Sequence, residues 1–510
     1  MIAWRWQQVG AWVALVLAAV AAVLIALRPD PYDALRRADK AFAAGKYRAA
    51  LSAYSTLTET LSDAALRRGI VLIVRGEVDP ARRSLIAAIK AGLRPRDYQL
   101  AVLYLGRVAA MEGDIAAARQ TWQSLTRCDP DRCVQRDLLL ADDDLRNGRI
   151  EEALATYRVI ALDALPADWA SFVIGQRAIL AALVNSAATP DLTVPATPFP
   201  PDPFAHPLLP SAPDPATLAA VFAAEPAARP QLLGQLALDL GYDRLALAFL
   251  AQVDPAGPHG LAAAIYRAYA HLRLGDRQQG VEQLEQLAAA YPADPRIGPL
   301  LALAYLNSGD LEAAGERLRR LRDSGHSGPA LALAEAGLAL AHRDFVAAAD
   351  AYEQAVIAAP IAERARYALL AARFHLDSGF ERCTSGLQAA QAAANVLPND
   401  PEALTVLAGT RYYCGDAAGA QVAAAAALEA GADVEARFYY GLALSASGDL
   451  TNGRAALELV ADQAPASVWR RRAETALELL GGKRNGASGF IRRLSRFDVL
   501  FASAPSLFLG

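Results

Sequence analysis

Apolar runs of helical periodicity fill residues 261–465, and a pattern of small, bulky and turn residues returns there about every 34 positions. Its clearest mark is a glycine followed by aspartate, placed after one apolar run and before the next: Gly275, Gly309, Gly415 and Gly448. Arg343-Asp344 falls 34 positions after Gly309-Asp310 and keeps this motif without its glycine. Glycine lets the chain leave a helix in a left-handed conformation, and aspartate favours the positive end of the next helix. The pattern therefore predicts pairs of helices joined by tight turns.

Small residues recur on both sides of each turn. Seven positions before it stand Ala268, Ala302, Ala336, Ala408 and Gly441, and five positions after it stand Gly280, Ala314, Ala348, Ala420 and Gly453. Nine positions after the turn comes a larger side chain in most copies: Leu284, Leu318, Tyr352 and Leu457, with Ala424 as the weak one. Small residues that face each other let two helix backbones approach closely. A hairpin of this kind cannot bury its apolar face alone, so it is expected to stack on its neighbours.

The same unit occurs earlier with looser spacing. Residues 31–185 hold about four copies, and a lone helix near residues 167–184 is expected to cap them; the turns are Gly45, Gly76, Gly113 and Gly148. Residues 216–466 hold about seven copies, beginning with a less regular one that turns at Gly241. One copy carries a short insertion around Glu381-Arg382-Cys383. Residues 467–480 predict a charged, solvated helix that caps this second array.

In period, small positions and closing prolines (Pro292, Pro360 and Pro465), this unit resembles the tetratricopeptide repeat. The alternative is an alanine-rich helical bundle, which a fixed period of this length disfavours. The resemblance implies an all-α protein with two α-solenoid arrays of helix-turn-helix units, and a separate apolar run, described below, adds one transmembrane helix before them. It also implies that protein or peptide partners bind in a superhelical groove.

Members of the family line this groove mostly with the first helix of each pair. The matching positions in this chain are mixed aromatic and polar residues: Arg107, Asp142, Tyr269, Arg273, Asn307, Tyr412, Tyr413 and Phe438. Each taken singly is also compatible with an ordinary solvated or half-buried helix position. As a set they predict a groove suited to a peptide or a helix.

Ten prolines between residues 190 and 215 interrupt the helical pattern. No regular helix tolerates that density, so residues 186–215 are predicted to be an extended linker. Fully extended, it would separate the two arrays by roughly 80 Å. It could instead lie along one array, or present prolines to a proline-reading domain.

Residues 9–27 form an unbroken apolar run after a short flank, residues 1–8. Its length spans a bilayer as a helix, and Trp4, Trp6 and Trp12 near one end suit the membrane interface. The alternative is a cleaved signal peptide, whose apolar region is usually shorter and ends in a small-x-small site. The run ends Ala26-Leu27-Arg28-Pro29 without such a site, which favours an uncleaved anchor.

The tail, residues 481–510, does not fit the repeat. On a helix, Phe490, Leu494 and Phe497 would share one face and three arginines another, as in a basic amphipathic helix that contacts an anionic membrane. The alternative is a tail that docks on the last repeat and covers its exposed end.

Cysteine spacing leaves several pairings open. Cys128 and Cys133 flank a tight Asp-Pro-Asp-Arg turn across which a disulfide can close. Cys383 and Cys414 fall at the turns of adjacent units, a separation that is long for a bridge unless a loop bends. Four ordinary small buried residues are an equally acceptable interpretation.

The side of the membrane that the repeats face is also open. More basic residues follow the predicted span than precede it, which would keep the body cytoplasmic, but long domains translocate largely regardless of such counts. A disulfide would favour the other side. We therefore expect a single-pass protein of the cell membrane with an extracytoplasmic body.

Composition and motifs argue against other classes of function. The net charge is −4, with no basic excess for nucleic acid. No phosphate-binding loop, His-Glu-x-x-His motif or Gly-x-Ser-x-Gly elbow occurs, so no cofactor, metal or catalytic residue is predicted. The expected function is a non-enzymatic scaffold that recruits or positions partners at the membrane. The alternatives are a non-catalytic accessory subunit of an envelope glycan-synthesis or secretion and assembly system, and a structural spacer.

Overall fold

The computed structural model describes residues 30–162, 165–185, 190–194, 202–210, 213–292, 294–464 and 467–481. These residues are helical and contain no strand, so the predicted all-α fold is confirmed. The chain separates into two compact units, residues 1–121 and residues 122–510. This division does not coincide with the proline-rich linker at residues 186–215, where the sequence suggested a boundary.

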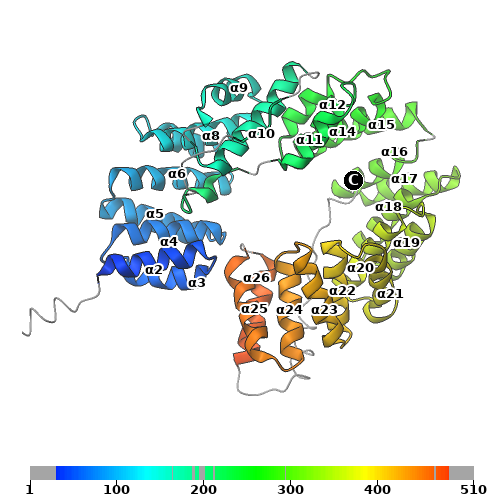
Figure 1. The fold of residues 1–510 in the computed structure, drawn as a ribbon. Coiled ribbons are helices and arrows are strands. Elements are labelled where there is room, and N and C mark those ends of the chain that lie inside the picture. The colour runs from blue at the N-terminus through cyan, green and yellow to red at the C-terminus, as the bar shows by residue number, and fades with distance from the viewer. Residues whose placement is uncertain are drawn as a thin grey trace, which may run out of the picture. The chain divides into compact units, whose positions relative to one another are not determined.

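The first unit consists of antiparallel helices that stack in chain order (Figure 1). They are α2 (Pro31–Ala43), α3 (Tyr47–Leu57), α4 (Ser62–Val74), α5 (Val78–Ala91) and α6 (Pro95–Met111), followed by α7 (Ile115–Gln123), which crosses into the second unit. Fully buried Tyr54 on α3 donates to Asp39 on α2 at 2.7 Å, and Asp39 pairs with Arg67 on α4 at 2.9 Å. Burial and the bond to Asp39 raise the pKa of Tyr54 far above its ordinary value. This contact therefore ties three successive helices together.

The second unit continues with helices α8 to α26 (Figure 1). Those before and just after the proline-rich segment are α8 (Pro130–Arg146), α9 (Ile150–Val159), α10 (Ala167–Val184), η2 (His206–Leu208), α11 (Pro215–Ala223), α12 (Arg229–Asp239) and α13 (Asp243–Leu250). Next come α14 (Gly260–Arg273), α15 (Arg277–Ala290), α16 (Ile297–Asn307), α17 (Leu311–Asp323), α18 (Pro329–Ala341) and α19 (Phe345–Ala358). The last are α20 (Arg364–Ser378), the π-helical turn η3 (Arg382–Gly386), α21 (Leu387–Val396), α22 (Pro401–Tyr413), α23 (Ala417–Glu429), α24 (Val434–Ala446), α25 (Leu450–Gln463) and α26 (Val468–Gly481).

The turns follow the predicted chemistry. Every glycine that the sequence placed at a turn has a positive φ: Gly45, Gly76, Gly113, Gly148, Gly241, Gly275, Gly309, Gly415 and Gly448. Arg343 occupies the same left-handed conformation, with φ 60°, where the glycine is missing. The aspartate that follows caps the next helix at Asp310, Asp344, Asp416 and Asp449, whose side chains accept from backbone N–H groups. Asp276 makes no such side-chain cap.

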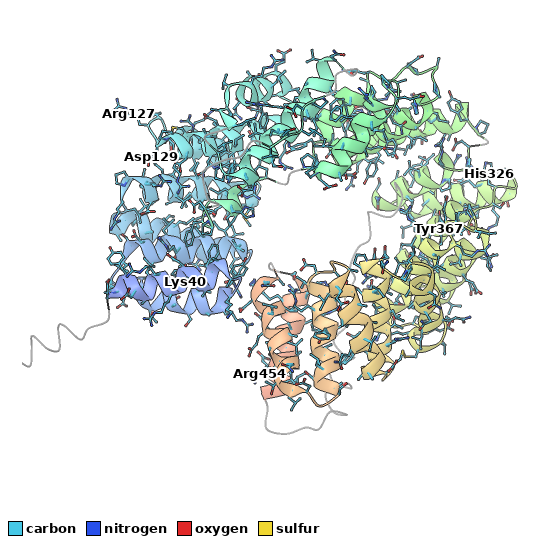
Figure 2. All side chains as sticks on the ribbon, viewed as in Figure 1. Lys40, Arg127, Asp129, His326, Tyr367 and Arg454 are labelled. Atoms are coloured by element: carbon cyan, nitrogen blue, oxygen red, sulfur yellow. A yellow bond between two sulfur atoms is a disulfide. The ribbon has the colours of Figure 1, made fainter. Side chains whose placement is uncertain are left out.

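The small positions lie where paired helices cross. Ala268, Ala302, Ala336 and Ala408 are 0% exposed. A Cβ added to Gly441 would lie 2.9 Å from Leu457 and 3.1 Å from the carbonyl of Gly453, so α24 and α25 approach almost backbone to backbone. Loops between pairs are also in contact. His326, labelled in Figure 2, lies in the loop after α17. Its ring contacts the carbonyl of Pro292 in the loop after α15 at 2.8 Å.

Helices on the two sides of the proline-rich segment pack directly against each other. Tyr242, the residue just before α13, is 0% exposed and donates to Asp142 on α8 at 2.6 Å. Gln176 on α10 donates to the same hydroxyl at 3.2 Å, and Arg146 lies over the tyrosine ring at 5.0 Å. Burial, together with Asp142, raises the pKa of Tyr242 well above its ordinary value. The two parts of the repeat region are therefore in contact at this junction.

The described part of the linker lies along these helices. Asp202 pairs with Arg132 on α8 at 3.2 Å, His206 pairs with Asp168 on α10 at 2.6 Å, and Leu208 is fully buried. The sequence left open whether the linker is an extended spacer or lies along one array. Residues 202–210 lie along helices α8 and α10.

Helix α10, Ala167–Val184, is long and apolar enough to cross a membrane by length and composition, with mean hydropathy 1.3, but 61% of it is buried inside the second unit. Fully buried Trp169, Phe172 and Val173 belong to the protein core. The predicted span at residues 9–27, with Trp4, Trp6 and Trp12, and the tail residues Phe490, Leu494 and Phe497 lie outside the described residues.

Candidate partner-binding face

First helices of the last repeats share one face, formed by α20, α22, α24 and α26. Arg373 on α20 pairs with Glu435 on α24 at 2.5 Å and with Glu402 on α22 at 3.5 Å. The side chains of Arg373 and Glu435 are 22% and 21% exposed, whereas that of Glu402 is 59% exposed. One guanidinium thus connects three helices at a partly open surface, which we call the C-terminal face.

Gly409 explains how side chains of α20 and α24 meet across α22. A Cβ at this position would lie 2.7 Å from the ring of Tyr439 on α24 and 3.0 Å from Leu376 on α20. Contacts that short do not occur for real side chains, so only glycine lets these helices close over α22. The small residue therefore sets the spacing of the face.

Arg373 and Glu435 on the C-terminal face stabilise each other's charge. Burial raises the pKa of the Glu435 carboxyl above its ordinary value, and the guanidinium of Arg373 offsets part of that rise. Burial also opposes the charge of Arg373, but the carboxylates of Glu435 and Asp377 outweigh it and raise its pKa. Because each charge compensates the other, the pair can remain ionised in a half-buried position.

An aromatic ladder lies beside this ion pair. Tyr413 on α22 contacts Tyr439 on α24 edge-on at 6.1 Å, and Tyr439 contacts Trp469 on α26 edge-on at 5.7 Å. Arg382 covers the Tyr413 ring at 4.2 Å, and Arg472 covers the Trp469 ring at 4.7 Å. Tyr439 is 1% exposed, while Tyr413 and Trp469 are half-buried, so the two ends of the ladder reach the surface.

The predicted groove residues are only partly brought together. Tyr413 belongs to the C-terminal face. Tyr412 and Phe438 are 1% exposed and Asp142 is 6% exposed, so these three are core residues rather than groove surface. The reason is the tight stacking of first helices, which turns these positions toward the neighbouring pair.

The other predicted residues lie elsewhere in the chain. Arg273 lies over the ring of Tyr269 at 5.9 Å and donates to the carbonyl of Leu238 at 2.7 Å, so it joins α14 to α12. Asn307 is exposed at the end of α16, and Arg107 is half-buried on α6 in the first unit. The predicted groove positions therefore do not form one site.

Several residues of the C-terminal face were missed from the sequence: Arg373, Glu402, Glu435 and Trp469. A signal did exist, because Glu402 and Glu435 both stand second in their helices, 33 positions apart, and so share a repeat position. Arg373 offers no comparable signal, since its partners are on two other helices.

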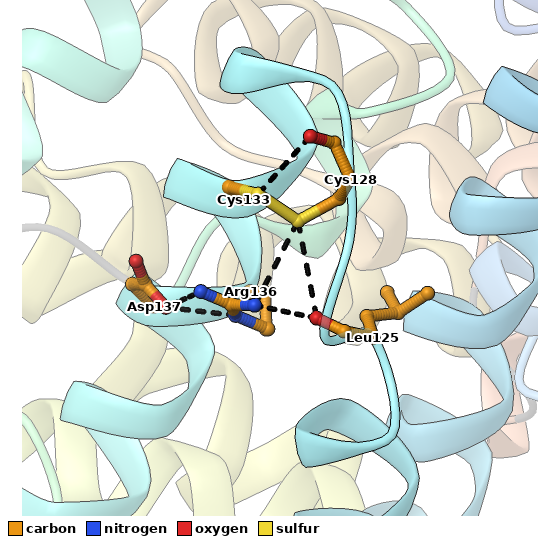
Figure 3. The surroundings of a disulfide bond; sticks show 5 residues. All are labelled: Leu125, Cys128, Cys133, Arg136 and Asp137. Carbon is orange, nitrogen blue, oxygen red and sulfur yellow. Dashed lines mark hydrogen bonds and ion pairs between the residues drawn. A yellow bond between two sulfur atoms is a disulfide. The ribbon is translucent and has the colours of Figure 1, made fainter.

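Two disulfides are present. Cys128 and Cys133 are bonded across the turn that begins α8, with a Cα–Cα distance of 5.4 Å. Arg136 in the next turn donates to the carbonyl of Leu125 at 2.5 Å and to Asp137 at 2.8 Å, beside the bonded sulfurs (Figure 3). This bond closes a short local loop.

Cys383 and Cys414 are also bonded, with a Cα–Cα distance of 5.4 Å. The sequence indicated a separation of about one repeat, too long for a bridge unless a loop bends. The loop does bend: the π-helical turn η3 brings Cys383 to Cys414 at the end of α22.

An open pocket of about 600 Å³ lies between α21 and the end of α22, where Arg411 donates to Gln391 at 2.8 Å beside Asn395. Within the part of the chain that the structure describes, no group of three or more His, Cys, Asp or Glu residues is arranged to hold a metal ion.

Stacked helical hairpins with left-handed turns and small crossing residues place this chain in the α-solenoid class. A family model for the tetratricopeptide repeat matches two stretches of the chain, residues 66–132 and 265–329. A search of curated proteins finds no match.

Solved structures with a similar arrangement include yeast Tom70, at 13% identity, covering 88% of this chain and 95% of that one, with a TM-score of 0.39. Another is the APC/C hetero-tetramer Cut9–Hcn1, at 12% identity, covering 84% and 92%, with a TM-score of 0.34. A third is a tetratricopeptide repeat protein from Parabacteroides merdae, at 13% identity, covering 59% and 94%, with a TM-score of 0.26. Values this low assign neither a partner nor a role to the chain.

Proposed function

We propose that this chain is a membrane-anchored tetratricopeptide repeat scaffold that binds protein partners and positions them at the bilayer. The observation that carries the proposal is the C-terminal face, whose first helices present the half-buried rings of Tyr413 and Trp469 and the exposed carboxylate of Glu402. Binding energy at protein interfaces concentrates on Trp, Tyr and Arg side chains in partly desolvated surroundings, and this face supplies all three. The proposed anchor is the apolar run at residues 9–27.

The excess of acidic residues in the second unit indicates which charge a partner should carry. Residues 122–481 contain 43 Asp and Glu against 28 Lys and Arg. An acidic body attracts basic partners and repels acidic ones, and it accelerates encounters at low salt. We therefore expect the partner to be basic where it approaches this unit.

Site-specific photocrosslinking in intact cells tests the proposal. A crosslinking amino acid replaces Glu402 or Arg366, which are exposed at the C-terminal face, and Glu429 or Gln354, which are exposed on second helices, as matched controls. The expected result is a discrete protein adduct from the first pair and none from the controls. Equal adducts from all four positions, or none from any, would contradict a selective face.

The identity of the adduct separates the scaffold from its alternative. Several different non-enzyme partners would support a scaffold within an envelope-assembly or secretion complex. A single enzyme, crosslinked in stoichiometric yield, would instead support an accessory subunit of an envelope glycan-synthesis system.

A further inference from the structure

We propose that the Cys383–Cys414 disulfide is a redox-sensitive latch that holds Arg382 on Tyr413 and so positions the edge of the C-terminal face. The inference rests on the proposed binding function of that face for its consequence, but the latch itself is a property of the fold.

The bond joins the inserted turn η3 to the end of α22. Cys383 follows Arg382, and Cys414 follows Tyr413, so the disulfide stands next to the stacked guanidinium and ring, 4.2 Å apart. The same guanidinium donates through Nε and Nη2 to the carbonyl of Leu376, at 3.1 and 2.7 Å. Arg382 thus connects the end of α20 to the end of α22, and the disulfide fixes the residue beside it.

Hydrogen bonds also hold the inserted turn, but the disulfide is the covalent link that joins it to the end of α22. Cys383, Thr384 and Ser385 are exposed, and Glu381 before them has φ 46°, a left-handed conformation that is costly for a residue with a Cβ. The bonds of Arg382 to Leu376 and the contact of the buried His375 ring with the carbonyl of Phe380, at 2.6 Å, tie the turn to α20 rather than to α22. Breaking the bond therefore removes the covalent restraint between the insertion and α22.

Tyr413 transmits this change to the face. Its ring touches Tyr439, which touches Trp469, so the latch is the first contact of a ladder that spans α22, α24 and α26. Side chains that are already immobilised lose less conformational entropy when a partner binds. The oxidised form is therefore the one prepared for binding.

The redox step itself is simple. A dithiol reductant gives two electrons and two protons to the Cys383–Cys414 bond, the bond breaks to two thiols, and the dithiol closes to its own disulfide. Cys383 is exposed and Cys414 half-buried, so a reductant can approach.

The first test is hydrogen exchange of the full chain in detergent, before and after dithiothreitol. Reduction is expected to accelerate exchange in residues 379–387 by about tenfold or more, because a cross-link no longer restricts local opening. The double variant Cys383→Ser/Cys414→Ser should reproduce this without reductant. Cys128→Ser/Cys133→Ser is the matched control and should leave residues 379–387 unchanged. Equal exchange in the oxidised and reduced chain would overturn the latch, whatever the partner.

The second test measures the consequence for binding. Reduction should lower the adduct yield from the crosslinker at position 402 by about threefold to tenfold, the loss expected for one or two side chains that are no longer immobilised. Cys128→Ser/Cys133→Ser, which keeps the Cys383–Cys414 bond, should give the adduct yield of the parent chain, and Tyr413→Ala should match the reduced form.

The outcomes separate the two proposals. Faster exchange with an unchanged adduct yield would contradict the positioning role while leaving the binding function intact. Absence of an adduct in either redox state would contradict the binding function, and the exchange measurement would still decide the latch.

Discussion

Tyr242 shows how one hydroxyl can join helices that lie 100 residues apart in the sequence. Its oxygen donates to Asp142 and accepts from Gln176, and both partners are buried. A buried carboxylate needs such donors because it has lost its hydration. The junction across the proline-rich segment therefore depends on a few polar side chains as well as on apolar packing.

Tyr242→Phe is expected to destabilise the second unit by about 1.5–3 kcal/mol, since a hydrogen bond to a charged buried group is lost and the volume hardly changes. Urea unfolding of the full chain followed by circular dichroism measures this. Tyr291→Phe is the control, because Tyr291 is 46% exposed and its substitution should shift the midpoint little. Equal midpoints for both variants would show that the contact contributes nothing.

Turn glycines form a second residue-scale case. Gly309 has φ 79°, and a Cβ there would meet nothing within 4 Å, so its substitution tests backbone conformation alone. Gly309→Ala is expected to lower the free energy of unfolding by about 1–2 kcal/mol. The comparison is Gly315→Ala on α17, where φ is not left-handed and an added Cβ would meet only Leu338 at 3.5 Å. In thermal unfolding, the midpoint temperature of Gly309→Ala should be lower than that of the parent chain. The midpoint of Gly315→Ala should be equal to that of the parent chain or higher.

At the scale of single residues, turn chemistry was predictable from the sequence, whereas burial of the groove candidates was not. A glycine with positive φ leaves a local signature at a fixed offset, and the turn glycines carry it. Tyr412 and Phe438 occupy groove positions of the repeat but are enclosed by the next helix pair, which depends on contacts between repeats.

At the scale of elements, helix pairs arise from local sequence, but the C-terminal face arises from the spacing between pairs. The positions of α20, α22 and α24 follow from the repeat, but two features of the face do not: the ion pair of Arg373 with Glu435 and the close approach of Tyr439 and Leu376 to Gly409. The insertion before α21 shows the same limit. Its extra residues were visible in the sequence, but the bend that brings Cys383 to Cys414 was not.

Gly409→Ala is expected to destabilise the stack of α20, α22 and α24. Overpacking against buried Tyr439 and Leu376 costs about 1–3 kcal/mol. The higher helix propensity of alanine offsets at most about 1 kcal/mol of this cost. Gly337→Ala on α18 is a matched control, since its Cβ would meet Leu306 at an ordinary 3.4 Å. In urea, the first variant should unfold earlier than the parent chain and the second at the same concentration or later. The reverse order would mean that Gly409 does not set the helix spacing.

At the scale of the whole molecule, a net charge of −4 conceals a strong segregation of charge. Residues 30–121 hold 15 Lys and Arg against 10 Asp and Glu, residues 122–481 hold 28 against 43, and residues 482–510 hold 5 against 1. Anionic lipid attracts basic segments and repels acidic ones over about a Debye length. The basic segment next to the proposed anchor and the basic tail are thus suited to a membrane surface, and the acidic remainder is suited to a partner in solution.

The proposed extracytoplasmic location connects this arrangement to the two disulfides. Disulfides persist outside the cytoplasm and are reduced within it, so the oxidation state of the four cysteines reports the side on which the repeats lie. Cells lysed in excess N-ethylmaleimide should yield a chain with no alkylated cysteine, and reduction before alkylation should label all four.

Protease added to spheroplasts gives an independent measurement of the same property, since it should digest the repeats before lysis. A chain that is alkylated at four positions without reduction, and protected from protease until lysis, would put the body in the cytoplasm. The Cys383–Cys414 latch would then rest in its open state, and the C-terminal face would be prepared for binding only under oxidising stress.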